Sequence, residues 1–284
     1  MEKILAGIDG SERGNKALEW AARLAWAEKA QLTLITVIDR AFLKDVGTHE
    51  EYAESCVGGL LENMAQRVYA KYPELICETR VEYGKPIEVL AKAADDYDML
   101  VVGSHHGRTI GKTVSGATGL RIVLSTKTPV AVIPADWTAE EAGDGILVAV
   151  GPEQRGDAAI NFGVKFADEL GMSIRLVSAW GLPAYLTLPS ESMGGGLQPV
   201  GAAFQERLDG YVASIKLDKP HLKVTGEAIE GPSPTKVLLE EGKSSAVLVM
   251  GAYAHTAIGR AVFGSVTHSV LLNLTVPTVL VSLD

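Results

Sequence analysis

Residues 4–14 read ILAGIDGSERG, and residues 146–156 read ILVAVGPEQRG. The two stretches align without a gap at a shift of 146 − 4 = 142 residues, and the same shift places residues 32–37 on residues 174–179. Such self-similarity is the signature of a duplicated structural unit. A chain of 284 residues is also about twice the usual size of one domain. The sequence therefore predicts two copies of one domain in tandem.

The register of the repeat returns after a variable middle segment. Residues 100–103 read LVVG and residues 248–251 read LVMG, now at a shift of 248 − 100 = 148 residues. Between the copies, residues 134–145 contain Pro, Asp, Trp, Thr, Glu and Gly in place of the apolar strand pattern, which is typical of a linker. We expect a first domain over residues 1–136, a linker over 137–144 and a second domain over 145–284.

Within the first copy, short apolar runs alternate with helical patterns. Residues 15–28, for example, carry apolar side chains at positions 17, 18, 21, 22, 25 and 26, which form one face of a helix. Strands that read as continuous Val, Ile and Leu runs, each followed by a helix, are typical of a parallel sheet buried on both faces. Each copy is therefore expected to be an α/β, Rossmann-like domain with a doubly wound, five-stranded parallel sheet. The expected strands are 3–8, 32–38, 77–83, 99–103 and 129–133, and the expected helices are 15–28, 51–72, 86–95 and 117–125.

The composition narrows the classes of partner. The formal net charge is −9 and the isoelectric point is about 5.2, which argues against a nucleic-acid partner because such affinity comes from Lys and Arg. No apolar run approaches the length of a membrane helix, and the N-terminus lacks the pattern of a signal peptide. Cys56 and Cys77 show no CxxC spacing, so we expect neither a metal site nor a disulfide framework. These features predict a cytoplasmic protein without a membrane partner.

The ends of the strands are the expected ligand site, because ligands of doubly wound sheets bind beyond the carboxyl ends, where the strand order reverses. The first strand ends in Ile8, Asp9, Gly10 and Ser11. Asp9 would accept a hydrogen bond from an adenine amino group or a ribose hydroxyl, and Gly10 would let the turn run close to a ligand. The alternative is that Asp9 and Ser11 merely cap the helix that follows.

The fourth strand leads into a glycine-rich loop, and residues 103–118 read GSHHGRTIGKTVSGAT. Together with the first strand end, the LVVG strand and the Thr-Pro-Val before the fifth strand, this loop resembles the universal stress protein family, in both halves of the chain. ATP-binding members of that family carry glycine, two residues, glycine, nine residues, and glycine followed by serine or threonine. In the family this loop wraps the ribose and phosphates, and the aspartate of the first strand faces the adenine. The resemblance implies a fold similar to the adenine nucleotide alpha hydrolases.

Each copy departs from the family motif at a different place. In the first copy Gly103 and Gly116 keep the spacing, but His106 replaces the middle glycine, a role that Gly107 could take, and Ala117 replaces the serine. In the second copy Gly251, Gly264 and Ser265 match, while Ala254 replaces the middle glycine and Gly151 replaces the aspartate. A side chain at a glycine position matters where the backbone touches phosphate, and a lost hydroxyl contact costs about 0.5–1.5 kcal/mol. We therefore expect weakened sites. The nucleotide-binding residues expected in the first copy are Ile8, Asp9, Gly10, Ser11, Val37, Gly103, Ser104, His106, Gly107, Gly116, Ala117 and Thr118, and those in the second are Val150, Gly151, Ala179, Gly251, Ala254, Gly264, Ser265 and Thr267.

Two other interpretations of the loop, a P-loop and a metal site, have less support. Gly111, Lys112 and Thr113 look like the end of a P-loop, but that motif requires glycine where His106 stands. The adjacent side chains of His105 and His106 diverge, so they do not chelate one metal ion easily. No catalytic constellation recurs in both copies, so no catalytic residue is expected and the protein is expected to be at most a weak ATPase.

The expected function is that of a stress-response regulator that binds ATP or AMP at one or both sites, with Mg²⁺ only if the nucleotide is ATP. A nucleotide-independent interaction module with the same fold, or a sensor of another small ligand, remains open as an alternative. The fifth strands, residues 129–133 and 277–281, would form an apolar sheet edge that has to be covered. The family pairs domains through this edge, which implies an intramolecular pseudo-dimer of the two domains and allows further homodimerisation.

Overall fold

The computed structural model describes residues 1–104, 121–151, 157–181, 198–252, 254–257 and 260–283. Its residues group into two compact units. The first unit comprises residues 1–141 together with 277–282 and 284, and the second comprises residues 142–276 together with 283. The C-terminal strand is thus grouped with the N-terminal unit.

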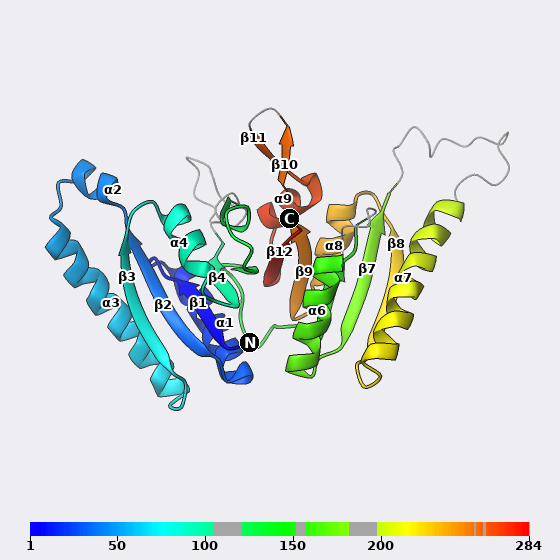
Figure 1. The fold of residues 1–284 in the computed structure, drawn as a ribbon, viewed down its shortest axis with the longest axis horizontal. Helices are drawn as coiled ribbons and strands as arrows, with labels where there is room; N and C mark the ends of the chain where they lie inside the picture. Colours follow the sequence, from blue (N-terminus) through cyan, green and yellow to red (C-terminus); the bar gives the residue numbers. More distant parts are fainter. Residues whose placement is uncertain (105–120, 152–156, 182–197, 253, 258–259, 284) are drawn as a thin grey trace. The chain divides into compact units, whose positions relative to one another are not determined.

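The first unit contains a parallel sheet in the order β3-β2-β1-β4-β5 (Figure 1). Its central strands are buried because they are covered on both faces, and Ile4, Leu5 and Ala6 are fully inaccessible to solvent. Strand β12 adds to β5 in antiparallel direction, with Thr278 opposite Val132, so the expected apolar edge of β5 is paired. The strands are β1 (Lys3–Gly7), β2 (Gln31–Ile38), β3 (Cys77–Tyr83), β4 (Met99–Gly103), β5 (Val130–Ile133) and β12 (Thr278–Ser282).

The helices of the first unit pack on this sheet according to the order of the strands. The chain winds outward from β1 to β3 and then returns past β1 to β4, so right-handed crossovers place α1 and α3 on one face and α4 on the other. Helix α1 packs against β1 and β4, and α3 packs against β2 and β3. The helices are α1 (Glu12–Glu28), α2 (Arg40–Asp45), α3 (Glu50–Lys71) and α4 (Pro86–Ala94).

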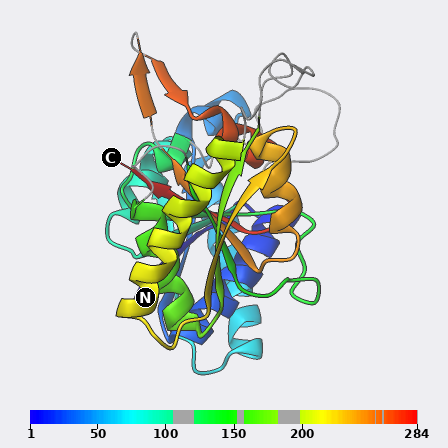
Figure 2. The ribbon, with the colours of Figure 1, turned by 90° about the vertical axis from the view of Figure 1, so that its right-hand side faces the viewer.

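The second unit repeats this plan, with parallel strands in the order β9-β6-β7-β8. Helix α7 lies along β8 (Figure 2), and a glycine in β8 permits this close packing, because a Cβ at Gly226 would lie 2.9 Å from Val212. The elements are β6 (Ile146–Ala149), α6 (Asp157–Leu170), β7 (Ile174–Trp180), α7 (Gln198–Asp218), β8 (Val224–Glu230), α8 (Pro234–Gly242), β9 (Val247–Ala252), β10 (Ala254–Ala257), β11 (Arg260–Phe263) and α9 (Ser265–Leu272).

The structure confirms the parallel α/β fold predicted for both copies, and it adds elements that the sequence pattern did not indicate. Helix α2 is one short segment of six residues that begins at the Asp39 cap, whose carboxylate accepts a hydrogen bond from the Ala41 amide at 2.9 Å. Strands β10 and β11 form an antiparallel hairpin. Of the helix expected over residues 117–125, residues 117–120 lie outside the described residues, and residues 121–123 are helical.

Candidate functional site

A cavity of about 440 Å³ lies in the first unit at the carboxyl ends of β1, β2 and β4. Strand β1 lies between β2 and β4, so this is the point where the chain changes direction across the sheet. Its size falls within the range of small-molecule sites. The cavity is lined by Gly7, Ile8, Asp9, Arg13, Gly14, Ile35, Thr36, Val37, Pro86, Ile87, Leu90, Val102, Gly103 and Ile122.

The turn after β1 holds Asp9 at the mouth of this cavity. Asp9 Oδ1 accepts hydrogen bonds from the amide and the hydroxyl of Ser11, and the amide bond measures 3.0 Å. Ser11 Oγ in turn accepts from the Gly14 amide at 3.1 Å, as the N-cap of α1. Gly10 adopts a left-handed conformation with φ of +75°, which favours glycine. Ser11 is therefore a helix cap, and within the described residues Asp9 keeps its Oδ2 oxygen without a recorded partner.

Two glycines allow the start of α1 to approach the strand ends. A Cβ at Gly14 would lie 2.7 Å from Asp9 Oδ1. A Cβ at Gly103 would lie 2.7 Å from the carbonyl oxygen of Arg13 and 3.0 Å from its carbonyl carbon. Both distances are shorter than van der Waals contact. A side chain at Gly103 would meet the backbone of α1 and would require the helix to move, whereas a side chain at Gly14 would displace the Asp9 carboxylate. These glycines bring Arg13 against the end of β4.

The opposite wall of the cavity is apolar and comes from α4, which supplies Pro86, Ile87 and Leu90. The sequence identified Pro86 as a helix start, but nothing in its pattern indicated that α4 borders the same cavity as β1. Arg13 was missed for the same reason. Both are brought to the site by the packing of helices on the sheet.

Four of the residues predicted for the first site line this cavity: Ile8, Asp9, Val37 and Gly103. Ser104 is buried, and its amide donates to the Ile133 carbonyl at 2.8 Å. The remaining predicted residues of the loop, His106, Gly107, Gly116, Ala117 and Thr118, lie outside the described residues.

The equivalent strand ends of the second unit differ in their charge. The Val150 amide donates to the Val177 carbonyl at 2.8 Å, as Ile8 does to Ile35 in the first unit. Gly151 follows in place of Asp9, and its carbonyl accepts a hydrogen bond from Arg207 Nη2 at 2.7 Å. A guanidinium group thus binds the backbone of the residue that stands in place of Asp9.

The other residues predicted for the second site lie in β7, β9 and β10 and at the start of α9. Ala179 is half-buried in β7. Thr267 is buried in α9, and its hydroxyl donates to the Gly251 carbonyl at 3.2 Å. Gly264 is the N-cap residue of α9 and Ser265 is its first residue. Ala254 is the first residue of β10.

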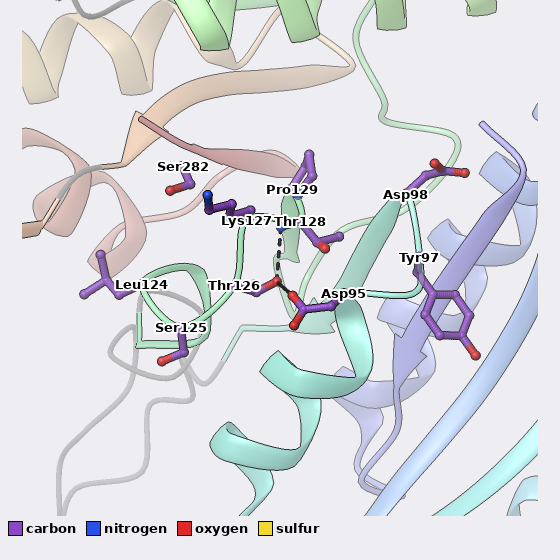
Figure 3. A pocket seen from close by; sticks show the side chains of 10 residues that line it. All are labelled: Asp95, Tyr97, Asp98, Leu124, Ser125, Thr126, Lys127, Thr128, Pro129 and Ser282. Carbon is purple, nitrogen blue, oxygen red and sulfur yellow. Dashed lines mark hydrogen bonds between the residues drawn. The ribbon is translucent and has the colours of Figure 1, made fainter. Parts of the chain in front are cut away.

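A second cavity of the first unit, of about 800 Å³, lies near the amino ends of β4 and β5 (Figure 3). Thr126 connects its walls, because its hydroxyl donates to Asp95 at 2.9 Å and accepts from the Thr128 amide at 3.1 Å. Asp98 accepts from the Lys3 amide at 2.9 Å, at the start of β1. The acidic residues that end and follow α4 therefore bind the segment before β5 and the start of β1.

The two cysteines lie in different environments. Cys56 is exposed and Cys77 is buried, and both are free thiols. Burial, followed by the charges of Glu62 and Glu78, raises the pKa of Cys77 to about 11. Among the residues that the structure describes, no group of three or more His, Cys, Asp or Glu side chains could hold a metal ion. In the same part of the chain, no helix is both long and apolar enough to cross a membrane.

Comparison with known proteins agrees with the repeat and the fold. The model of the universal stress protein family matches residues 1–134 and again residues 144–282. A universal stress protein of Mycolicibacterium smegmatis is 24% identical over 98% of this chain and 96% of its own length, and one from Mycobacterium tuberculosis is 22% identical over 97% and 95%.

Solved structures show the same fold along the whole chain. A universal stress protein from Archaeoglobus fulgidus superposes with a TM-score of 0.68 at 17% identity, covering 99% of this chain and 98% of that one. A functionally unknown protein from Pseudomonas aeruginosa gives a TM-score of 0.65 at 15% identity, covering 99% and 92%. The chain therefore belongs to the universal stress protein family and carries two copies of its domain.

Proposed function

We propose that the first domain binds an adenine nucleotide, ATP or AMP, in the cavity at the ends of β1, β2 and β4, and that the protein is a stress-response regulator rather than a strong catalyst. The observation that carries this proposal is the position of Asp9 at the mouth of an apolar cavity at the switch point of the sheet. Apolar walls from Val37 and Leu90 suit the faces of a base.

The chemistry of Asp9 supports the same ligand. Its Oδ1 oxygen is engaged with Ser11, which fixes the orientation of the carboxylate. Its Oδ2 oxygen would accept a hydrogen bond from the adenine amino group or a ribose hydroxyl. The cap role and the ligand role, which the sequence alone left as alternatives, are therefore compatible: Ser11 caps α1, and Asp9 orients Ser11 with one oxygen while the other serves the ligand.

Asp9→Asn tests this role. Asparagine keeps an acceptor for Ser11 but replaces the Oδ2 acceptor by an amide donor, so the turn is expected to survive while the ligand bond is lost. A hydrogen bond to a charged group contributes about 1.5–3 kcal/mol, which corresponds to about 10- to 100-fold in affinity. Isothermal titration calorimetry with AMP and with ATP plus Mg²⁺ measures this change.

Asp96→Asn is the matched control, since Asp96 is exposed beyond the end of α4 and does not line the cavity. It removes the same charge and should bind like the wild type. Binding that is equally weak in both variants would mean that net charge, not the Asp9 contact, controls affinity. A wild-type chain that releases no heat with millimolar AMP or ATP would favour the rival function, an interaction module independent of nucleotide, and mass spectrometry of co-purifying ligand would detect a sensor of another small molecule.

For the second domain we propose a weaker site, built on Gly251, Gly264, Ser265 and Thr267. It lacks the aspartate, and Arg207 lies against Gly151. Titration of the wild type to millimolar nucleotide would reveal this site as a second, weaker binding event, with a stoichiometry above one nucleotide per chain. The domain limits proposed from the repeat, with a linker over residues 137–144, could be tested by limited proteolysis, and homodimerisation by light scattering.

A further inference from the structure

Arg13 is the second charged side chain of the first cavity, beside Asp9, among the residues that line it. It lies in the first turn of α1 and is half-buried. Its backbone is fixed against β4, because a Cβ at Gly103 would lie within 3.3 Å of Arg13 Cβ. Neither an ion pair nor a side-chain hydrogen bond engages its guanidinium within the described part of the chain.

Arg13 as a residue is half-buried, and an arginine that is removed from water is usually paired with an anion or an acceptor. Other arginines on the described helices and strands of this unit have partners. Arg23 donates to the Ala139 carbonyl, Arg67 to Asn15, and Arg80 to Glu82. Arg13 differs from these arginines because it lines the cavity. The partner that would complete it is therefore expected to come from the ligand.

We infer that Arg13 binds the phosphate of the nucleotide and makes this cavity select phosphorylated ligands over the nucleoside. The inference rests on the proposed function and extends it to the anionic end of the ligand. The planar guanidinium presents parallel N–H donors that match two phosphate oxygens. The first turn of α1 adds the positive end of the helix dipole on the same side. Asp9 and Arg13 thus contact different parts of the ligand. The carboxylate accepts from donors of the base or sugar, and the guanidinium donates to the phosphate.

The repeat agrees with this assignment at the level of the sequence. The position aligned with Arg13 in the second copy is also an arginine, Arg155, although its structure lies outside the described residues. The neighbouring positions differ, since Asp9 aligns with Gly151 and Ser11 with Glu153. An arginine has thus persisted in both copies at a turn where the adjoining polar residues diverged.

The test compares adenosine, AMP and ATP by calorimetry on the full chain, with the variants Arg13→Gln, Arg13→Lys and Arg23→Gln. Arg13→Gln should weaken AMP about 10- to 100-fold, the effect of one charge-assisted contact, and leave adenosine within about twofold. Arg13→Lys keeps the charge but not the two parallel donors, so it should fall between the wild type and Arg13→Gln. Arg23→Gln removes the same charge from the same helix about 15 Å away and should bind like the wild type.

A measurement on the wild type alone provides a second readout should a variant fail to fold. Raising the salt concentration should weaken AMP and leave adenosine unchanged, because salt screens a charge–charge contact. Equal loss of adenosine and AMP in Arg13→Gln, or AMP binding as tight as in the wild type, would overturn the role of Arg13 while the nucleotide site stands. A wild type that binds none of the three compounds would overturn the proposed function, and this inference with it.

Discussion

Replacing Gly103 by alanine is expected to destabilise the first unit by forcing α1 away from the end of β4. The added Cβ would lie 2.7 Å from the carbonyl oxygen of Arg13 and 3.0 Å from its carbonyl carbon. Both atoms belong to the backbone of α1, so no side-chain rotation relieves the contact. Overpacking of this kind typically costs about 1–3 kcal/mol of the free energy of unfolding.

Two other glycines provide matched controls for the expected loss of stability in Gly103→Ala. At the equivalent position of the second copy, Gly251, the added Cβ would lie 2.7 Å from Leu283 Cδ1, the end of a flexible side chain that is half exposed. Gly251→Ala should therefore cost less than Gly103→Ala. Gly58 lies inside α3 with nothing within 4 Å of an added Cβ, so Gly58→Ala should stabilise the protein by about 0.5–1 kcal/mol, the helix preference of alanine over glycine.

The assay must report each unit separately, because a chain with two compact units need not unfold in one step. Native-state hydrogen exchange on peptides that cover β1 and β4, compared with peptides that cover β6 and β9, meets this need. Gly103→Ala should lower protection in the first pair alone. A cost for Gly103→Ala equal to or below that of Gly251→Ala would refute the reasoning that backbone contact sets the penalty.

Two further outcomes are expected. Thr126→Val should lower the free energy of unfolding by about 1–3 kcal/mol in urea denaturation, because Asp95 and the Thr128 amide each lose a partner; Thr126→Ser should retain most of it, and equal losses would exclude the hydroxyl as the cause. Because the pKa of Cys77 is raised to about 11, the folded state favours the neutral thiol, and this contribution to stability is complete below the unfolded pKa of about 9 and is lost as the pH rises from about 9 to about 11. Alkylation at pH 8 should accordingly modify exposed Cys56 and spare Cys77 until the protein unfolds, whereas equal rates would contradict its burial.

The candidate site was predictable wherever it depended on the ends of strands. Ile8, Asp9, Val37 and Gly103 follow or end apolar runs, and the carboxyl ends of parallel strands meet at one edge of a sheet. Arg13 was not predictable in this way. It precedes the helix that the apolar pattern predicts from residue 15, and only the packing of α1 on β4 brings it to the cavity.

The same limit explains the elements that the sequence did not indicate. Helix α2 spans six residues, which is too short for a period of 3.6 to be recognised. Asp98, which follows α4, binds the backbone at the start of β1, 95 residues away in sequence from Lys3. Contacts over such separations leave no local pattern.

The sequence by itself determined the duplication, the parallel α/β fold of each copy and the edge of the sheet where a ligand would bind, because hydrophobic periodicity and repeated motifs are local properties of the chain. The tertiary structure decided which side chains share the cavity, since helices α1 and α4 reach it from opposite faces of the sheet. It also resolved the turn after β1. Ser11 caps the helix and Asp9 orients that cap, because Gly10 and Gly14 provide the backbone freedom and the space that place the Asp9 carboxylate between the helix and the cavity.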